Sequence, residues 1–212
     1  MFATDRDLLL LEPNLFRDAS WIGQRLLASS GSLVGSLLTL ISGDFGSVGI
    51  VPGHVLLYDA TPTEIIGVTA GNKVTISLVR SDPAGPVIPP PSTGTKPVIV
   101  STFGPQLAVA HHQILRMLGL EPSTTAGEGR LTETSIVNPR SLWLVEALGA
   151  LYFIYSAAAA LSGPASPLGE RAELYRRLFA EERKLVAARI DTNADGIADA
   201  TRRMNVLQLT RG

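Results

Sequence analysis

The stretch NPRSLWLVEALGALYFIYSAAAALSG, residues 138–163, decides the fold of this chain. An Asn-Pro pair opens it, and a Gly-Pro pair follows its last apolar residues, as at the start and the end of a helix. Between these signals, the 21 residues 141–161 carry a single charge, Glu146. A helix that is apolar on every side must be surrounded by protein or by lipid, so the rest of the chain has to be organised around it.

The apolar helix could be surrounded by lipid. About 20 apolar residues cross a bilayer, so a single-span or membrane-associated protein through residues 141–161 is an alternative. Glu146 disfavours such a span, and the four alanines at 157–160 insert only weakly. Small side chains of this kind also let packed helices approach one another closely. We therefore expect protein to surround the helix, and no membrane as a partner.

The composition excludes several classes of function. Charged residues make up 17% of the chain, against about 25% in ordinary soluble domains, which indicates that much surface is buried within the fold or against other subunits. The net charge of −1 gives no general attraction to nucleic acid or to an anionic membrane. The absence of cysteine excludes disulfides and thiolate chemistry. The first residues lack the basic region of a signal peptide, so we expect a cytoplasmic site of synthesis.

The remaining sequence divides the chain into four parts. Turn residues recur every eight to twelve positions before residue 100, and short apolar runs such as 74–79 separate them, which predicts antiparallel strands. Helical spacing of apolar residues returns after Thr102. The sequence predicts an α+β protein: a helical bundle built around the long apolar helix, with an inserted small antiparallel β-barrel or sandwich and an extended C-terminal arm. The parts are an N-terminal helical arm packing on the bundle (1–24), the inserted domain (25–100, with a Pro-rich connector at 81–97), the bundle (101–190), and an acidic loop with the C-terminal arm (191–212).

Two amphipathic helices are expected beside the apolar helix, at residues 105–118 and 168–190. In the N-terminal arm, Phe16, Trp21 and Ile22 are expected to dock the arm on the core, since aromatic and large aliphatic side chains usually serve packing. The bundle, in turn, should pack within the subunit and against neighbouring subunits. The residues expected to make this packing are Trp143, Leu148, Tyr152, Ala158, Tyr175 and Phe179.

The chain shows no pattern of catalytic residues. His111 and His112 are adjacent in the expected helix 105–118, so they point about 100° apart and cannot both bind one metal ion. The third histidine, His54, lies far away in the sequence. We therefore expect two polar or interface histidines, and a protein that is not an enzyme.

An acidic loop lies near the C-terminus. Asp191, Asn193, Asp195 and Asp199 have the 1, 3, 5, 9 spacing of a calcium loop, with Gly196 at position 6. Position 12 is an arginine, so the bidentate carboxylate of such loops is missing. Two interpretations stay open: a bound calcium ion, which would make the chain a calcium-stabilised interaction module, or a turn capped by its own Asp side chains. We expect no other cofactor.

Several stretches resemble one family. They are Phe103-Gly-Pro-Gln-Leu-Ala, Asn138-Pro-Arg, and Tyr175-Arg-Arg-Leu-Phe-Ala-Glu-Glu-Arg, followed by the loop 191–199 and the tail with Arg202, Arg203 and Leu209. Over residues 101–212 the chain resembles the head-to-tail adaptor (connector, or head completion) proteins of tailed bacteriophages.

This resemblance implies a structural virion protein. Its copies would form a ring, usually dodecameric, in the virion neck below the portal protein, assembled in the host cytoplasm. The ring would join the portal to the tail or to a tail-completion protein, and DNA would pass through its exit channel only as a passenger. The β-rich domain would face the tail or neighbouring subunits. The C-terminal arm, residues 200–212, would reach into portal clefts through Arg202, Arg203, Val206, Leu207, Leu209 and Arg211.

Overall fold

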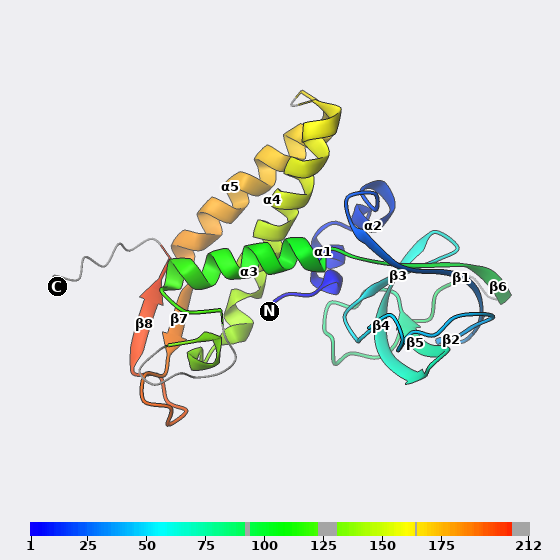
Figure 1. The fold of residues 1–212 in the computed structure, drawn as a ribbon, viewed down its shortest axis with the longest axis horizontal. Coiled ribbons are helices and arrows are strands. Elements are labelled where there is room, and N and C mark those ends of the chain that lie inside the picture. The colour runs from blue at the N-terminus through cyan, green and yellow to red at the C-terminus, as the bar shows by residue number, and fades with distance from the viewer. Residues whose placement is uncertain (92–93, 123–130, 164, 205–212) are drawn as a thin grey trace. The chain divides into compact units, whose positions relative to one another are not determined.

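A computed structural model describes residues 1–91, 94–122, 131–163 and 165–204 of the chain. The chain folds into two compact units, Thr4–Pro105 and Met1–Ala3 with Gln106–Gly212. The first unit holds the β-strands of a barrel and the second holds most of the helices (Figure 1). The predicted α+β class is therefore confirmed.

The β-rich unit is a closed barrel, which decides between the two predicted arrangements. Its strands follow the order β1-β2-β5-β4-β3-β6, and all the pairings between them are antiparallel. The long strand β1 pairs with both β2 and β6 and so closes the sheet. The strands are β1 Gln24–Val34, β2 Leu37–Leu40, β3 Val55–Tyr58, β4 Thr61–Ala70, β5 Lys73–Ser77 and β6 Gly94–Thr102.

Alternating apolar side chains fill the barrel. Leu38, Leu56 and Val98 point inward and are completely buried, as the period-two pattern of the strands requires. Gly31 of β1 is needed for this packing because a Cβ atom there would lie 2.9 Å from Leu38 Cδ1 and 3.1 Å from the Thr39 carbonyl oxygen. The core is thus continuous around the whole sheet.

Two short helices, α1 Asp5–Leu11 and α2 Leu15–Asp18, belong to the barrel unit. We had expected the arm 1–24 to pack on the helical bundle, but residues 4–24 group with the barrel instead. Buried ion pairs explain this placement: Glu64 of β4 accepts from Arg6 Nε at 2.5 Å and from Arg80 Nε at 2.6 Å. Because all three side chains are buried, removing Glu64 would leave Arg6 and Arg80 without the buried carboxylate that they share.

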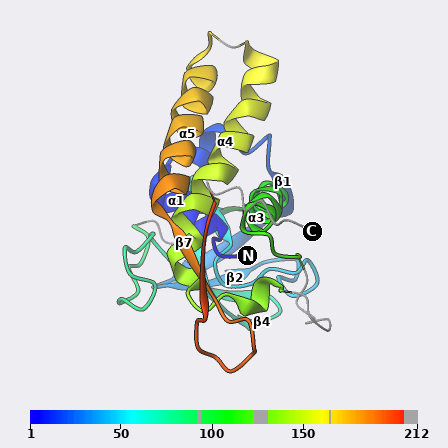
Figure 2. The same cartoon turned by 90° about the vertical axis from the view of Figure 1, so that its left-hand side faces the viewer.

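The helical unit contains the long apolar helix, which starts with a short 3-10 turn, η2 Pro139–Leu142, and continues as α4 Trp143–Ser162. A second helix, α5 Pro167–Leu185, runs back along it, as Figures 1 and 2 both show. The ring of Tyr155 stacks on the ring of Tyr175 with the centroids 5.5 Å apart. Helix α3, Gly104–Leu118, approaches the pair at Gly149, where a Cβ atom would lie 3.1 Å from the Phe179 ring and 3.3 Å from Ala110 Cβ.

The chain itself covers much of the apolar helix. Among the described residues, one helix, Pro139–Ser162, is long and apolar enough to cross a membrane. Its central residues from Val145 to Leu151 are all buried inside the protein, and so are Ile154, Tyr155 and Ala158. Protein therefore surrounds the central part of this helix, from Val145 to Leu151.

The last helix is shorter than predicted. It ends at Leu185, and residues Ala187–Ile190 form strand β7, which pairs with β8, Ala200–Arg203. Ala188 and Ile190 are completely buried while Arg189 between them is exposed, a period of two that suits a strand and not a helix. The predicted helix 168–190 is wrong over these last residues.

The strand β8 also corrects part of the predicted C-terminal arm. Its residues pair with β7, and Arg202 Nη1 donates to the carbonyl oxygens of Leu118 and Gly119 at 2.7 and 2.9 Å. An arginine in this position satisfies carbonyl groups at the end of α3, so residues 200–203 are not a free arm. The other predicted arm residues, Val206, Leu207, Leu209 and Arg211, lie outside the described residues.

Candidate functional site

The far half of α4 carries apolar side chains that its own chain leaves partly uncovered. Phe153 is half-buried, Ala157 and Ala160 are exposed, and Leu161 is 77% exposed. The spacing of Phe153, Ala157 and Ala160 places them on one face of the helix. Tyr155 and Ala158 occupy the face that packs inside the unit. This half of α4 therefore offers an apolar face made largely of small side chains.

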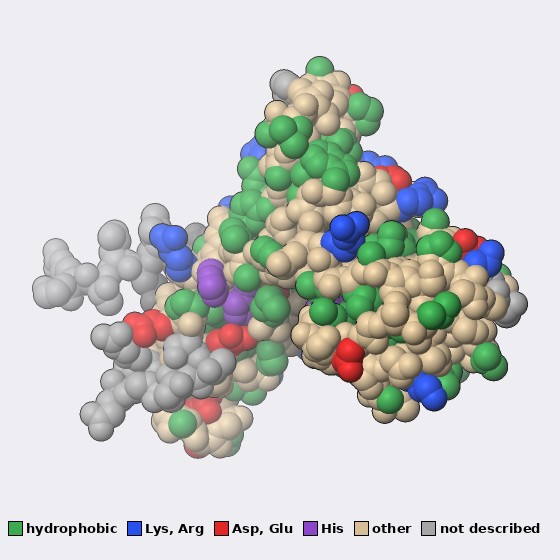
Figure 3. Space-filling view, turned by 45° about the vertical axis from the view of Figure 1, so that its right-hand side comes forward, with side chains coloured by type: hydrophobic (Ala, Val, Ile, Leu, Met, Phe, Trp, Pro, Cys, Tyr) green, Lys and Arg blue, Asp and Glu red, His purple; other side chains and the backbone are tan. Residues whose placement is uncertain are grey.

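Helix α5 carries a second apolar face. Leu174 and Leu178 are each 41% exposed and Leu185 is 79% exposed. Leu174 and Leu178 each precede a core residue, Tyr175 and Phe179, by one position, so they point about 100° away from the α4 contact. Figure 3 shows hydrophobic side chains gathered over this hairpin. We call Phe153, Ala157, Ala160 and Leu161 the alanine face, and Leu174, Leu178 and Leu185 the leucine face.

The residues predicted to pack between subunits lie mostly inside their own chain. Leu148, Ala158, Tyr175 and Phe179 are buried, while Trp143 and Tyr152 are half-buried. The amphipathic helix expected at 168–190 would have one apolar side, whereas the structure divides the apolar residues of α5 between two sides. Leu174, Leu178 and Leu185 are spaced by four and by seven residues, which is a helical spacing. This spacing was the sequence signal that could have shown a second apolar side of the helix.

A buried chain of polar side chains crosses the helical unit. His111 Nδ1 of α3 lies 2.7 Å from Glu146 Oε2, and His111 Nε2 lies 3.0 Å from Glu133 Oε2 of the 3-10 turn η1, Glu133–Ser135. Glu146 Oε1 accepts from the backbone N–H groups of Phe2 and Ala3 at 3.0 and 3.1 Å. The single charge of the apolar helix is thus fully paired, which is the usual condition for burying a carboxylate.

Charges around His111 change its pKa and that of Glu133. Burial by itself lowers the pKa of His111, but the hydrogen bonds and negative charges of Glu146 and Glu133 outweigh it and raise that pKa above its usual value. Burial raises the pKa of Glu133, but the amino group of Met1 at 2.9 Å and His111 outweigh it and lower that pKa. His112, by contrast, is exposed. His111 is therefore a buried, paired side chain and His112 an exposed one, and the sequence alone did not show this difference.

The acidic loop connects β7 to β8 and is held by its own side chains. Asp191 Oδ1 accepts from the backbone N–H groups of Asn193 and Ala194 at 3.1 and 2.7 Å, and Asp191 Oδ2 accepts from that of Gly196 at 2.7 Å. Burial raises the pKa of Asp191, but these donors outweigh it and keep that pKa below its usual value. Asp199 Oδ2 accepts from the N–H of Thr192 at 3.0 Å.

These contacts bear on the calcium interpretation. The carboxylate oxygens that would bind calcium accept N–H groups of the loop itself, as in a turn capped by Asp side chains. Over the part of the chain that the structure describes, no group of three or more His, Asp or Glu side chains is placed to hold a metal ion. The arrangement of Asp191, Asn193, Asp195 and Asp199 is the one that the capped-turn interpretation predicts, and the calcium interpretation is left to a titration experiment.

Three comparisons with known proteins were made. No family model, no curated protein and no solved structure matched the chain. The candidate surfaces are therefore argued from the residues and their geometry alone.

Proposed function

We propose that this chain is a structural protein of the virion neck of a tailed bacteriophage, a ring-forming head-to-tail adaptor that joins the portal to the tail and lines the DNA exit channel. It has no catalytic activity in this proposal. One observation supports it most directly: the α4–α5 hairpin leaves two apolar faces partly uncovered, on different sides of the same hairpin.

Exposed apolar faces of this kind are typical of contacts between proteins. A monomeric soluble protein seldom exposes contiguous apolar side chains on two sides of one element, because each such face favours association. The low share of charged residues agrees with a chain that buries additional surface in an assembly. A second copy of the chain is the simplest partner, because it carries both an alanine face and a leucine face and can therefore cover either one.

The two faces differ in shape, which favours a ring over a symmetric pair. A two-fold dimer uses the same patch on both subunits. A contact between two different patches is repeated from copy to copy, and it closes into a ring where the rotation between copies closes and forms an open filament where it does not. The leucine face offers protruding side chains, and the alanine face offers a surface that lets a second helix approach closely. Leu174 and Leu178 of one copy would then pack against Phe153 and Ala157 of the next.

The portal contact belongs to the chain beyond β8 in this proposal. Val206, Leu207, Leu209 and Arg211 remain the residues that we expect to bind the portal. Arg202 contributes by holding the base of this segment against α3 through its bonds to Leu118 and Gly119. A chain that ends at Met204 keeps this base and should therefore form the helical unit but fail to bind the portal.

The test is an assembly experiment with the purified chain and the portal ring of the same phage. Sedimentation velocity and electron microscopy should find a ring of this chain, alone or on the portal. Leu174→Glu combined with Leu178→Glu should abolish ring formation without unfolding the chain, because both side chains are partly exposed. Val109→Glu, at an exposed apolar position of α3, is the matched control and should assemble normally.

Two results would contradict the proposal. One is a chain that stays monomeric at all concentrations and in the presence of the portal. The other is a chain recovered only in detergent, which would favour the membrane alternative through residues 141–161.

A further inference from the structure

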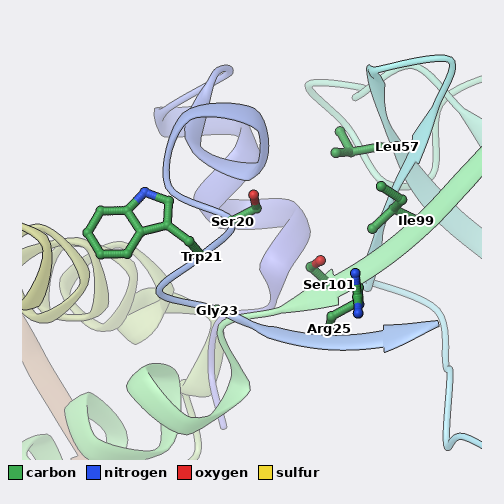
Figure 4. Close-up of a pocket in the computed structure, with 7 residues that line it drawn as sticks. All are labelled: Ser20, Trp21, Gly23, Arg25, Leu57, Ile99 and Ser101. Carbon is green, nitrogen blue, oxygen red and sulfur yellow. The ribbon is translucent and has the colours of Figure 1, made fainter. Parts of the chain in front are cut away.

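The outer wall of the barrel holds a pocket that the proposed function does not use (Figure 4). Its volume is about 360 Å³, which lies within the usual range for ligand pockets. The segment after α2 forms one side of it, and the strands β1, β3 and β6 form its floor. The pocket is lined by Ser20, Trp21, Gly23, Arg25, Leu57, Ile99 and Ser101.

The floor of the pocket is apolar although it faces away from the barrel core. Leu57 of β3 and Ile99 of β6 are directly opposite each other in the sheet, and both are half-buried. Trp21 lines the pocket from the segment after α2, but its indole is turned away from Leu57, Ile99 and Arg25, as Figure 4 shows. The side chain is 51% exposed, and its indole N–H donates to the Asp18 carbonyl oxygen at 3.3 Å. The predicted docking of Trp21 on the core is therefore wrong, whereas Phe16 is buried as predicted.

Arg25 gives the pocket its charge. It lies opposite Ser101 in the pairing of β1 with β6, and its side chain is exposed. The structure gives its guanidinium group no hydrogen bond or ion pair with any described residue. A guanidinium group beside an apolar floor suits a ligand in which a carboxylate lies next to an apolar side chain.

A segment with this chemistry is present in the same chain. At the tip of the β7–β8 loop, Ile197 is 67% exposed and lies between two exposed carboxylates, Asp195 and Asp199. The loop 191–199 carries three acidic residues and no basic one. Its sign is therefore complementary to Arg25, the only charged residue among those that line the pocket.

The loop tip is also held in one conformation before it binds anything. Asp195 Oδ1 accepts from the Ile197 N–H at 2.7 Å, and Asp191 accepts three further N–H groups of the loop. Ala194 and Gly196 have φ values of +64° and +84°, which the Asp191 contacts stabilise. A tip ordered in this way loses little conformational entropy on binding, which favours association.

We propose that the tip of the β7–β8 loop of one copy docks into the Trp21 pocket of a second copy. Ile197 packs on Leu57 and Ile99, and Asp195 or Asp199 pairs with Arg25. The inference rests on one part of the proposed function, the association of several copies of this chain. It joins two different surfaces, so it is compatible with a ring and gives that ring a contact separate from the alanine and leucine faces.

Cross-linking can test the docking cleanly because the chain contains no cysteine. Two single-cysteine variants are made, Ser20→Cys in the pocket and Ala198→Cys in the loop, and they are mixed with a short bismaleimide. The mixture should give a cross-linked dimer that contains one chain of each kind. Each variant alone should give several-fold less. Ser81→Cys, at an exposed serine of the barrel unit outside the pocket, is the matched control for Ser20→Cys.

Each outcome of this experiment decides the question. Equal cross-linking of Ala198→Cys with Ser20→Cys and with Ser81→Cys overturns the docking, and so does the absence of any dimer in the first mixture. A chain with both Ser20→Cys and Ala198→Cys that cross-links only within itself overturns it as well. If no ring forms on the portal but the specific dimer does, the proposed function fails and the docking stands.

A second measurement tests the chemistry of the contact. Arg25→Glu should lower the yield of the specific dimer about tenfold, while Arg25→Lys should keep most of it because the positive charge remains. Ile197→Ser should lower the yield several-fold as well, because it removes the apolar contact with Leu57 and Ile99. A yield from Ile197→Ser equal to that of the original pair would overturn the packing of Ile197 on the pocket floor.

Discussion

His111 of α3 and Glu146 of α4 lie 2.7 Å apart in the interior of the helical unit, and the second ring nitrogen of His111 lies 3.0 Å from Glu133. A histidine between two carboxylates is more stable in its protonated form. The stability of the unit should therefore depend on pH through this one side chain.

The sign of that dependence follows from the two pKa shifts. The pKa of His111 is raised above 6.5 in the folded chain, so its contribution is complete below pH 6.5 and is lost as the pH rises through the folded value. The pKa of Glu133 is lowered below 4.5, so its contribution is present above pH 4.5 and is lost as the pH falls. His111→Gln should remove the alkaline decrease of the melting temperature. A variant whose melting curve still falls between pH 6.5 and 9 as the original does would contradict this assignment.

Asp5 predicts a pH dependence of the same sign as that of His111, at lower pH and in the barrel unit. Burial raises the pKa of Asp5 from 3.8 to about 6, although it accepts hydrogen bonds from the Thr102 side chain and the Phe103 N–H. The unfolded chain then loses this proton at lower pH than the folded chain, so stability falls by about 3 kcal/mol as the pH rises from about 4 to about 6. Asp5→Asn should remove most of this fall and raise the stability at pH 7.5. Urea denaturation at pH 4.5 and 7.5 measures the effect, and an equal fall in both proteins would count against it.

Alanines at neighbouring positions of α4 should behave differently. Ala158 is completely buried, so Ala158→Glu places an unpaired charge inside the unit and should prevent folding, or the formation of rings. Ala157 is exposed on the alanine face, so Ala157→Glu should fold normally and lose only assembly. Circular dichroism and sedimentation velocity separate the two effects. Normal assembly of Ala157→Glu would show that this face is not covered by another copy.

Gly149 marks the point where three helices meet. A Cβ atom there would lie 3.1 Å from the ring of Phe179 and 3.3 Å from Ala110 Cβ. Gly149→Ala gains about 1 kcal/mol of helix propensity but forces these neighbours apart, which costs about 1–3 kcal/mol. We expect a net loss of stability in thermal unfolding, with Ala157→Gly, at an exposed position of the same helix, as a control for propensity alone. A melting temperature above that of the original chain would show that the helices separate easily.

The acidic loop should be stable without a metal ion. Asp191→Ala removes the acceptor of three backbone N–H groups and should lower the melting temperature in the presence of a chelator. Calorimetric titration with millimolar calcium should give no saturable heat. A saturable heat together with a calcium-dependent rise of the melting temperature would restore the calcium interpretation.

Local patterns in the sequence were enough for the apolar helix and for the antiparallel strands before residue 100, but they left a barrel and a sandwich open. The period of two in 74–79 is a property of neighbouring residues, and so are the start and stop signals around α4. Local patterns could not show that α5 ends at Leu185 and β7 begins at Ala187. The apolar residues of 186–190 fit the spacing of a helix as well as the alternation of a strand. What decided it was pairing with β8, about ten residues further along the chain.

The polar contacts were the least accessible to sequence analysis. His111 meets Glu146 across 35 positions and Arg6 meets Glu64 across 58, and no local spacing connects such residues. The chemistry of each residue was readable, but the partner depended on the packing of whole helices and strands. The same is true of the Trp21 pocket, whose lining comes from three strands and the segment after α2.

The closure of the barrel has a consequence for behaviour at high protein concentration. Because β1 pairs with β6 as well as with β2, each of the six strands of the barrel has a neighbour on both sides. Open strand edges are the usual template on which proteins aggregate into fibres. Many copies of this unit can therefore lie close together without forming a continuous intermolecular sheet. The side chains and loops on the outside of the barrel then determine which contacts form.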